Sequence, residues 1–331
     1  MSGADLPIGR RELLRRGLSA AAAATVVASG GVFARAAARR ADTPLPQRAF
    51  GSTGRTLPRV GLGCYPLGNL ADEAVAIAVI ERAHELGVRC FDTAPSYANG
   101  TSERRVGRAL RGVLAGENRA GLWLATKTIE RGGAAARREL EQSLARLGVD
   151  YLDAVQVHEV HSDWERLFAK DAVVAALQQA REEGLVRAIG LTCHRHPKYA
   201  KAAIERFPFA TALVPVNPID VQLHSFTRDF LPFAAERQVA VVAMKLFAGG
   251  QLVDAGRLTA RDCLRYALAQ PQVDLIVPGC ETVAEIEEAV AVAKEATPPS
   301  AAELRAIEQR AGAHEGKASE WWKDDADPSE R

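Results

Sequence analysis

The sequence lacks the features that mark several large classes of protein. Its 331 residues carry a formal net charge of +1, so the overall charge gives no indication of a nucleic-acid partner. The five cysteines are scattered and include no CxxC pair, which argues against a zinc ribbon or an iron–sulfur cluster. Apolar residues make up 47% of the chain and charged residues 25%, as in ordinary globular proteins. Any signal of function must therefore be local.

The first 41 residues contain no acidic residue after Glu12 and differ from the rest of the chain. A basic start with Arg10 and Arg11 precedes an apolar run over residues 17–34, which is shorter than the roughly 20 apolar residues of a membrane span. Together with a possible cleavage site at residues 34–36, this pattern resembles a twin-arginine export signal. A disordered basic tail or an uncleaved anchor is the alternative.

Export has consequences for partners and location. We expect residues 1–45 to be an export signal and linker that engages the twin-arginine export machinery. The mature protein would then be periplasmic or otherwise exported, without a stable membrane span. If the signal is not used, the protein stays in the cytoplasm.

Beyond a short hairpin pattern at residues 48–57, apolar strands alternate with amphipathic helices. Eight near-continuous apolar runs are predicted to be parallel strands buried on both faces: residues 59–63, 88–92, 122–126, 152–157, 188–191, 212–216, 239–243 and 274–277. The predicted helices that follow them cover residues 72–86, 102–114, 134–147, 172–183, 197–206, 227–237, 259–268 and 283–293.

Eight strand–helix units predict an α/β fold, a (β/α)8 TIM barrel over residues 46–312, with an N-terminal β-hairpin and an extra C-terminal helix. Residues 313–331 are expected to form a polar C-terminal tail. A doubly wound open sheet is the alternative, but no GxGxxG motif follows the first strand.

Four polar residues lie at or just beyond the carboxyl ends of three neighbouring predicted strands. Asp92, Lys127 and His158 end the second, third and fourth strands, and Tyr97 follows Asp92 by five residues. In a (β/α)8 barrel these ends meet at one mouth. The alternative for this group is a structural Asp92–Lys127 ion pair with Tyr97 as a loop aromatic.

These four side chains can protonate a carbonyl that accepts a hydride. An adjacent Lys127 ammonium is expected to lower the pKa of the Tyr97 phenol from about 10 toward neutrality. Asp92 would keep the lysine charged, and His158 would orient the carbonyl oxygen. The reaction is reversible, because the Tyr97 phenolate can take the proton back from an alcohol.

The segment Phe-Asp-Thr-Ala-Pro-Ser-Tyr at residues 91–97, followed by Asn-Gly-Thr-Ser-Glu at 99–103, resembles the signature of the aldo-keto reductases. Shorter matches occur at residues 50–54, 61–63 and 277–279. The resemblance covers residues 47–310 and implies an NADPH- or NADH-dependent reductase of a small-molecule aldehyde or ketone, without a metal. It implies a catalytic tetrad of Asp92, Tyr97, Lys127 and His158.

The resemblance also implies a set of cofactor-binding positions: Thr192, Cys193, Asn217, Met244, Lys245, Gly249, Gly279, Glu281 and Glu285. Several of these depart from the family pattern. Thr192-Cys193 stands where Ser-Asn is usual, and Met244-Lys245 where Tyr-Ser is usual. Lys245 and the glycine-rich turn after it suit a pyrophosphate, by charge and open backbone amides. Glu281 and Glu285 would repel a 2′-phosphate, so the choice between NADH and NADPH stays open.

Tyr65 and Trp164 are candidates for the wall of the substrate pocket, as is either Trp321 or Trp322. Three other functions compete with the reductase. Histidine pairs at 158/161 and 194/196 are typical of metal hydrolases, but the first strand offers no HxH. Lys127 could be the Schiff-base lysine of a lyase. The altered cofactor positions also permit a catalytically slow nicotinamide-binding redox sensor.

Overall fold

The computed structural model describes residues 43–295 and 297–323. The chain divides into two compact units, Met1–Thr43 and Pro44–Arg331, and the fold below is that of the second. The predicted export signal lies outside the described residues, apart from its last few positions.

Eight parallel strands form one sheet in sequence order, as the alternating pattern predicts. They are β3 (Leu62–Gly63), β4 (Cys90–Asp92), β5 (Trp123–Thr128), β6 (Leu152–Val157), β7 (Val186–Thr192), β8 (Thr211–Pro215), β9 (Ala240–Met244) and β10 (Leu275–Ile276). Parallel bridges from Val60 to Ile276 and from Gly63 to Gly279 join the first strand to the last. The sheet therefore closes into a (β/α)8 barrel, and the predicted fold class is confirmed.

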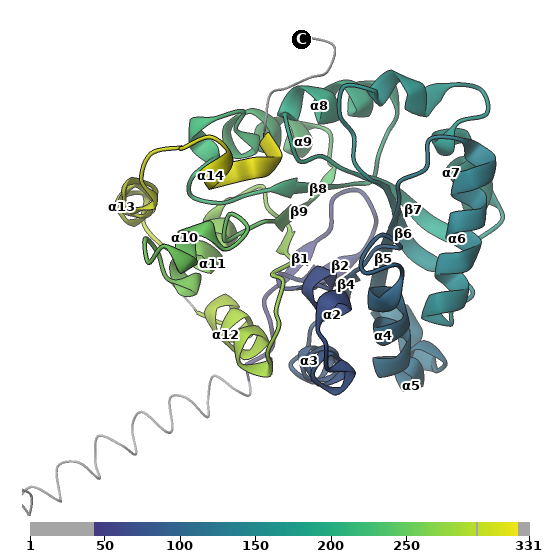
Figure 1. Cartoon of the computed structure of the whole chain (residues 1–331), viewed down its shortest axis with the longest axis horizontal. Coiled ribbons are helices and arrows are strands. Elements are labelled where there is room, and N and C mark those ends of the chain that lie inside the picture. Colours follow the sequence, from purple (N-terminus) through teal and green to yellow (C-terminus); the bar gives the residue numbers. More distant parts are fainter. Residues whose placement is uncertain (1–42, 296, 324–331) are drawn as a thin grey trace, which may run out of the picture. The chain divides into compact units, whose positions relative to one another are not determined.

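Helices surround the barrel (Figure 1). The main ones are α3 (Glu73–Glu85), α4 (Thr101–Ala109), α5 (Arg111–Leu114), α6 (Gly133–Leu147), α7 (Val173–Glu182), α8 (Pro197–Arg206), α9 (Leu231–Glu236), α11 (Ala260–Ala269) and α12 (Val283–Ala293). Shorter elements are α2 (Tyr65–Asn69), η1 (Glu117–Gly121), η2 (Trp164–Phe168), η3 (Asp220–Gln222), η4 (Phe226–Phe230) and α10 (Gln251–Asp254). No helix in the described ranges is long and apolar enough to cross a membrane.

Alternate residues of each strand pack on opposite sides of the barrel wall, because side chains in a strand alternate with a period of two. On β7, Ala188 belongs to the cluster inside the barrel, whereas Ile189 and Leu191 belong to the layer under the helices. On β5, Trp123 and Ala125 point inward. Lys127 follows in the same register. This alternation decides which residues reach the mouth.

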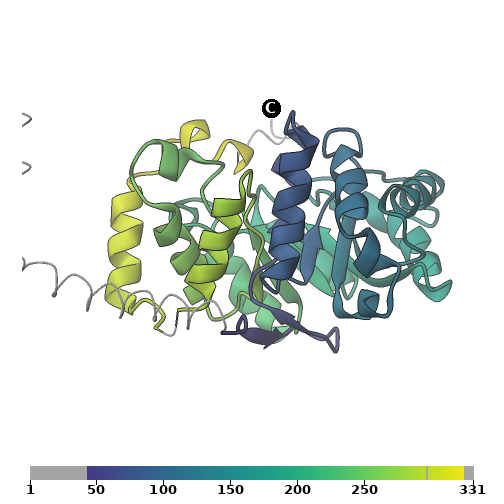
Figure 2. The same cartoon turned by 90° about the horizontal axis from the view of Figure 1, so that it is seen from below.

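An antiparallel hairpin of β1 (Gln47–Ala49) and β2 (Thr56–Pro58) covers the end of the barrel where the strands begin (Figure 2). Phe50 is 1% exposed and packs edge-on against Trp123, with 4.9 Å between ring centroids. Ser52 donates a backbone hydrogen bond to Gln238, just before β9. With this end covered by the hairpin, the carboxyl ends of the strands form the opposite mouth.

The chain after the barrel continues through α13 (Ala301–Ala311), α14 (Lys317–Glu320) and η5 (Trp321–Lys323). The prediction of a polar tail from residue 313 misses the packing of its first part. We name residues 313–323 the C-terminal segment. In it, Glu320, Trp322 and Lys323 are at most 4% exposed, so the segment is part of the folded unit.

Candidate active site

Asp92 and Lys127 form a buried ion pair at the carboxyl ends of β4 and β5. The Lys127 ammonium lies 2.5 Å from Asp92 Oδ2 and donates to the Thr93 carbonyl at 2.8 Å. The other oxygen of Asp92 accepts from Gln156 Nε2 at 2.6 Å. Burial opposes the charge on Lys127, but Asp92 and Tyr97 outweigh it, so the pKa of Lys127 is raised above its ordinary value. The lysine is therefore a stable cation.

Tyr97 lies over this ion pair. The Lys127 ammonium is 4.8 Å from the centroid of the Tyr97 ring. Burial raises the pKa of Tyr97, and the charge of Lys127 and its hydrogen-bond contact with the phenol counteract only part of the shift. The expectation of a lowered pKa is wrong in its net direction, because the sequence does not show how deeply the phenol is buried. The side chains nevertheless meet as predicted.

His158 completes the group from the end of β6. Its ring centroid lies 6.4 Å from that of Tyr97, and the two rings are nearly perpendicular. Burial, with smaller contributions from nearby cations, lowers the pKa of His158 to about 3. The imidazole is thus neutral at physiological pH and can donate a hydrogen bond, but cannot serve as a cationic acid.

A second imidazole, His194, lies beside His158 with 5.5 Å between ring centroids. Its Nδ1 is 3.6 Å from the carboxylate of Glu159, and its buried Nε2 has no partner among the described residues. The hydroxyl of Thr192 and Nδ1 of His158 are likewise buried without a partner in the described part of the chain. Unpaired buried polar atoms are uncommon, so their gathering here indicates a place for a ligand.

Cys193 was predicted to face the site, whereas the structure places His194 there, beside His158. Cys193 belongs to the layer between barrel and helices, and its thiol donates to the His196 carbonyl. The period of a strand places Thr192 and His194 on the inner side and Cys193 on the outer side. This alternation could have indicated from the sequence that His194, and not Cys193, lies on the inner side.

Asn217 is occupied by the protein itself. Its Oδ1 accepts from the backbone amides of Ile219 and Asp220, both at 3.0 Å, and its Nδ2 donates to Glu320 at 3.1 Å. The structure thus ties this predicted cofactor residue to the C-terminal segment.

Met244 and Lys245 end β9 at the mouth. Met244 packs against the cluster inside the barrel. Lys245 has a positive φ of 54° and lies over the indoles of Trp321 and Trp322, at 5.1 and 4.6 Å from the ring centroids. Gly249, in the same loop, is so close to both tryptophans that a Cβ would touch them at 3.5 Å or less.

The loop after β10 has a more exposed set of predicted cofactor residues. Gly279 lies against the Pro66 ring, where a Cβ would clash at 2.9 Å. Glu281 is exposed, and the Glu285 carboxylate accepts from the amides of Glu281 and Thr282 at 2.6 and 3.1 Å. Glu285 therefore caps the start of α12 and places a negative charge at the N-terminus of this helix.

The two residues predicted to line the substrate pocket, Tyr65 and Trp164, lie in different places. Tyr65 is 59% exposed and packs edge-on against Tyr97, with 5.1 Å between centroids. Trp164 instead makes its ring contact with Phe168, at 6.2 Å. Tyr65 thus lies at the mouth, and Trp164 packs against the core cluster under the helices.

The histidine pairs considered for a metal do not converge. His158 and His194 face each other, while His196 stacks on His224 with 4.0 Å between centroids. Within residues 43–295 and 297–323, no three His, Cys, Asp or Glu side chains are arranged to hold a metal ion.

Comparison with known proteins agrees with this geometry. The sequence profile of the aldo/keto reductase family matches residues 59–262. L-galactose dehydrogenase of Arabidopsis thaliana is 26% identical over 297 residues, which cover 76% of this chain and 89% of the relative. An NADH-specific methylglyoxal reductase of Escherichia coli is 34% identical over 167 residues, covering 43% of this chain and 50% of that protein.

Solved structures show the same fold. An aldo-keto reductase from Bacillus halodurans in its holo form superposes with a TM-score of 0.69 at 24% identity, covering 82% of this chain and 98% of that one. One from Klebsiella pneumoniae, solved in complex with NADPH, gives 0.67 at 23% identity, covering 84% and 99%. From its profile match and its barrel, this chain belongs to the aldo/keto reductase family and is an oxidoreductase.

Proposed function

We propose that this protein reduces an aldehyde or ketone to an alcohol with NADH or NADPH, with Tyr97 as the proton donor. The observation that carries the proposal is the 2.5 Å ion pair of Lys127 and Asp92 beneath the Tyr97 phenol. A side-chain ammonium that is 1% exposed is costly unless it is paired. Here the pair also places a fixed positive charge beside the one group that can give up a proton.

The mouth suits the nicotinamide end of a dinucleotide. The unpartnered Thr192 hydroxyl and His194 Nε2 can hydrogen-bond a carboxamide, and Met244 offers a polarisable surface to a flat ring. Gly279 and the backbone after Lys245 remain candidates for the phosphates. The 2′-phosphate of NADPH finds no basic partner at Glu281 and Glu285, so the residues favour NADH.

The chemistry proceeds on this chain's residues as follows. A bound reduced nicotinamide supplies the hydride. Neutral His158 donates a hydrogen bond to the carbonyl oxygen and holds it near the Tyr97 hydroxyl. Tyr97 gives its proton to that oxygen as the charge develops. The phenolate that remains is stabilised by the Lys127 ammonium until solvent returns a proton.

The raised pKa of Tyr97 is compatible with this role. An alkoxide is a much stronger base than a phenolate, so proton transfer from Tyr97 to the developing alkoxide stays favourable. In the reverse direction the enzyme needs the phenolate, which is scarce at neutral pH. The site thus favours reduction over alcohol oxidation near neutrality.

Of the competing functions, the geometry argues against the Schiff-base lyase, and kinetics must separate the redox sensor. A Schiff-base lysine must be a neutral nucleophile, whereas Lys127 is held as an ammonium by Asp92. A redox sensor that binds the dinucleotide and turns over slowly would use the same contacts. Steady-state turnover with simple aldehydes separates the sensor from the enzyme.

We also propose, from the sequence pattern of residues 1–45, that the folded protein is exported by the twin-arginine route. Because reduced nicotinamide is not expected to be regenerated freely outside the cytoplasm, we further propose that the cofactor is tightly held and cycles between two substrates. Nucleotide that copurifies with the exported protein would support this. Mature protein that neither carries nor retains nucleotide after incubation would contradict it.

The proposed function is tested by titrating purified protein with NADH and with NADPH while following nicotinamide fluorescence, then by adding aldehydes. Saturable binding with turnover that Tyr97→Phe abolishes would support the reductase. Binding that survives with no turnover in the wild type would favour the sensor, and absence of binding would refute both.

A further inference from the structure

Lys245 carries an ammonium whose direct contacts within the described residues are with aromatic rings. The residue follows β9 at the mouth and is half-buried, yet in the described part of the chain it makes no hydrogen bond or ion pair. Its contacts are the faces of two indoles, at 4.6 and 5.1 Å from the ring centroids. A cation–π contact attracts the charge but leaves the N–H donors of the ammonium free for another group.

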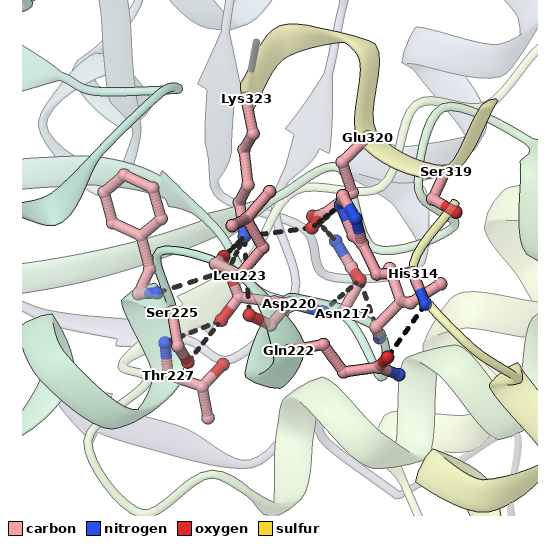
Figure 3. A network of polar contacts seen from close by, with 12 residues as sticks. Asn217, Asp220, Gln222, Leu223, Ser225, Thr227, His314, Ser319, Glu320 and Lys323 are labelled. Carbon is pink, nitrogen blue, oxygen red and sulfur yellow. Dashed lines mark hydrogen bonds and ion pairs between the residues drawn. The ribbon is translucent and has the colours of Figure 1, made fainter. Parts of the chain in front are cut away.

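The two indoles are held there by the C-terminal segment. Trp321 and Trp322 sit between Glu320 and Lys323, whose side chains are fully buried. The Lys323 ammonium binds Asp220 Oδ1 at 2.6 Å, Glu320 Oε2 at 3.0 Å and the Leu223 carbonyl at 2.8 Å (Figure 3). Removing either charge from such a buried pair is costly, so the segment is fixed to the loop after β8.

The same network is reinforced from the barrel side. The Asp220 carboxylate accepts from Ser225 Oγ at 3.1 Å and from the Thr227 amide at 2.8 Å (Figure 3). Asn217 reaches Glu320 at 3.1 Å. The chain thus uses a dedicated set of buried polar contacts to keep two tryptophans around Lys245.

Lys245 belongs electrostatically to the reaction centre. Its positive charge acts on the imidazoles of His158 and His194 and contributes to lowering the pKa of each, after burial. The unpartnered His194 Nε2 and Thr192 Oγ1 lie at the end of β7, which β8 separates from β9 in the barrel. A ligand with its carbonyl at His158 can therefore place a second polar group near Lys245.

We propose that Lys245, held by Trp321 and Trp322, binds the carboxylate of an acidic carbonyl substrate. The inference rests on the proposed reductase function and names its substrate class. Lys245 could bind either of two oxyanions, the carboxylate of a substrate or the pyrophosphate of the dinucleotide. A carboxylate fits better because Glu159 and Glu320 also act on Lys245, and their negative charges disfavour a pyrophosphate with its two charges more than a monoanion.

The test compares matched aldehydes, of which one in each pair carries a carboxylate: 4-oxobutanoate with butanal, and 4-carboxybenzaldehyde with benzaldehyde. In full-length enzyme, Lys245→Met is expected to raise KM for the acids roughly 10- to 100-fold, the usual range for a charge-assisted hydrogen bond. KM for the neutral aldehydes should change less than about twofold. Trp321→Ala, at a 59% exposed position, should move KM in the same direction by a smaller factor.

Lys201→Met is the control, since Lys201 also lies over an aromatic ring, that of Phe233 at 5.3 Å, but on α8. Dissociation constants for NADH and NADPH are measured on each variant without substrate. If Lys245→Met weakens dinucleotide binding and leaves the ratio of acid to neutral KM unchanged, the ammonium serves the pyrophosphate, and the substrate assignment is overturned. Equal losses on both aldehydes of a pair, or no change, overturn it as well.

Direct binding separates this inference from the reductase itself. Butanoate carries the carboxylate but no reducible carbonyl, and its binding can be followed by the fluorescence of the flanking tryptophans. Saturable quenching in the wild type that Lys245→Met removes would support the subsite even if no aldehyde were turned over. Absence of quenching in the wild type would count against it.

Discussion

Replacing Lys127 by Met separates a catalytic role of the ion pair from a structural one. The ammonium lies 4.8 Å from the centre of the Tyr97 ring, so it stabilises the phenolate by roughly 3 kcal/mol at an effective dielectric constant of 20. That energy corresponds to about two pKa units or about a 100-fold loss in kcat. The same change leaves the Asp92 carboxylate buried without its cation, which costs about 3–5 kcal/mol of unfolding free energy.

The double variant Asp92→Asn/Lys127→Met provides the control, because it removes both charges and leaves Gln156 with a neutral partner. We expect it to recover much of the lost stability in urea unfolding but little of the lost kcat. The acidic limb of the rate profile for alcohol oxidation reports the pKa of Tyr97, because that direction needs the phenolate. This limb should move up by about two pH units in Lys127→Met. It should move up by less in the double variant, because the Asp92 charge, which raises the pKa of Tyr97, is removed as well. Full activity in the double variant would show that the ion pair only supports the fold, and the acid–base argument would fail.

Four further predictions follow from particular side chains. Tyr97→Phe should lower kcat by about 10²- to 10⁴-fold while leaving the melting temperature and nucleotide affinity unchanged, as measured by steady-state kinetics and thermal unfolding. Because the pKa of Lys245 is lowered to about 8 by burial, it loses its proton above that pH; KM for acidic aldehydes should rise there and that for neutral ones should not. Lys323→Met should cost about 3–5 kcal/mol in urea unfolding, whereas Lys201→Met should cost less than about 0.5. Glu281→Arg should improve the Kd for NADPH relative to NADH by roughly three- to tenfold in fluorescence titration, and a shift toward NADH would contradict the reading of that loop.

The barrel could be predicted because its signal is periodic and local. Parallel strands buried on both faces appear as short apolar runs, and eight of them alternate with amphipathic segments. The start of β7 was predicted two residues late, since the strand begins at Val186. Arg187 interrupts the apolar pattern there, and its guanidinium pairs with Asp153 at 3.1 Å. Such a pairing joins two strands and cannot be seen in either one alone.

The proposed catalytic group was predictable because its members lie at or just beyond the ends of strands, whereas the proposed cofactor contacts depend on the direction of each side chain. Thr192 and Cys193 are adjacent in the sequence, which suggests that both contact the same ligand. Their side chains lie on opposite sides of the barrel wall, and His194 lies on the inner side with Thr192. The predicted direction of the Tyr97 pKa shift was wrong for a related reason. The charge of Lys127 can be inferred from a motif, but the burial of the phenol cannot.

The C-terminal segment shows why some of the site is invisible in the sequence. Residues 313–323 consist of polar and small residues apart from two tryptophans, so composition indicates a solvated tail. The contacts that bury them join residues far apart in the sequence, such as Lys323 and Asp220, which are separated by 103 positions. Burying a lysine is unfavourable unless a carboxylate waits at the right place, and no local pattern reveals that partner. The backbone amides of Phe226 and Thr227 donate to the Asp220 carboxylate and fix its position. A carboxylate held in this way can anchor the C-terminal segment through Lys323. The fixed carboxylate of Asp220 thus holds Lys323, and Lys323 holds the two tryptophans that flank the ammonium of Lys245 at the mouth.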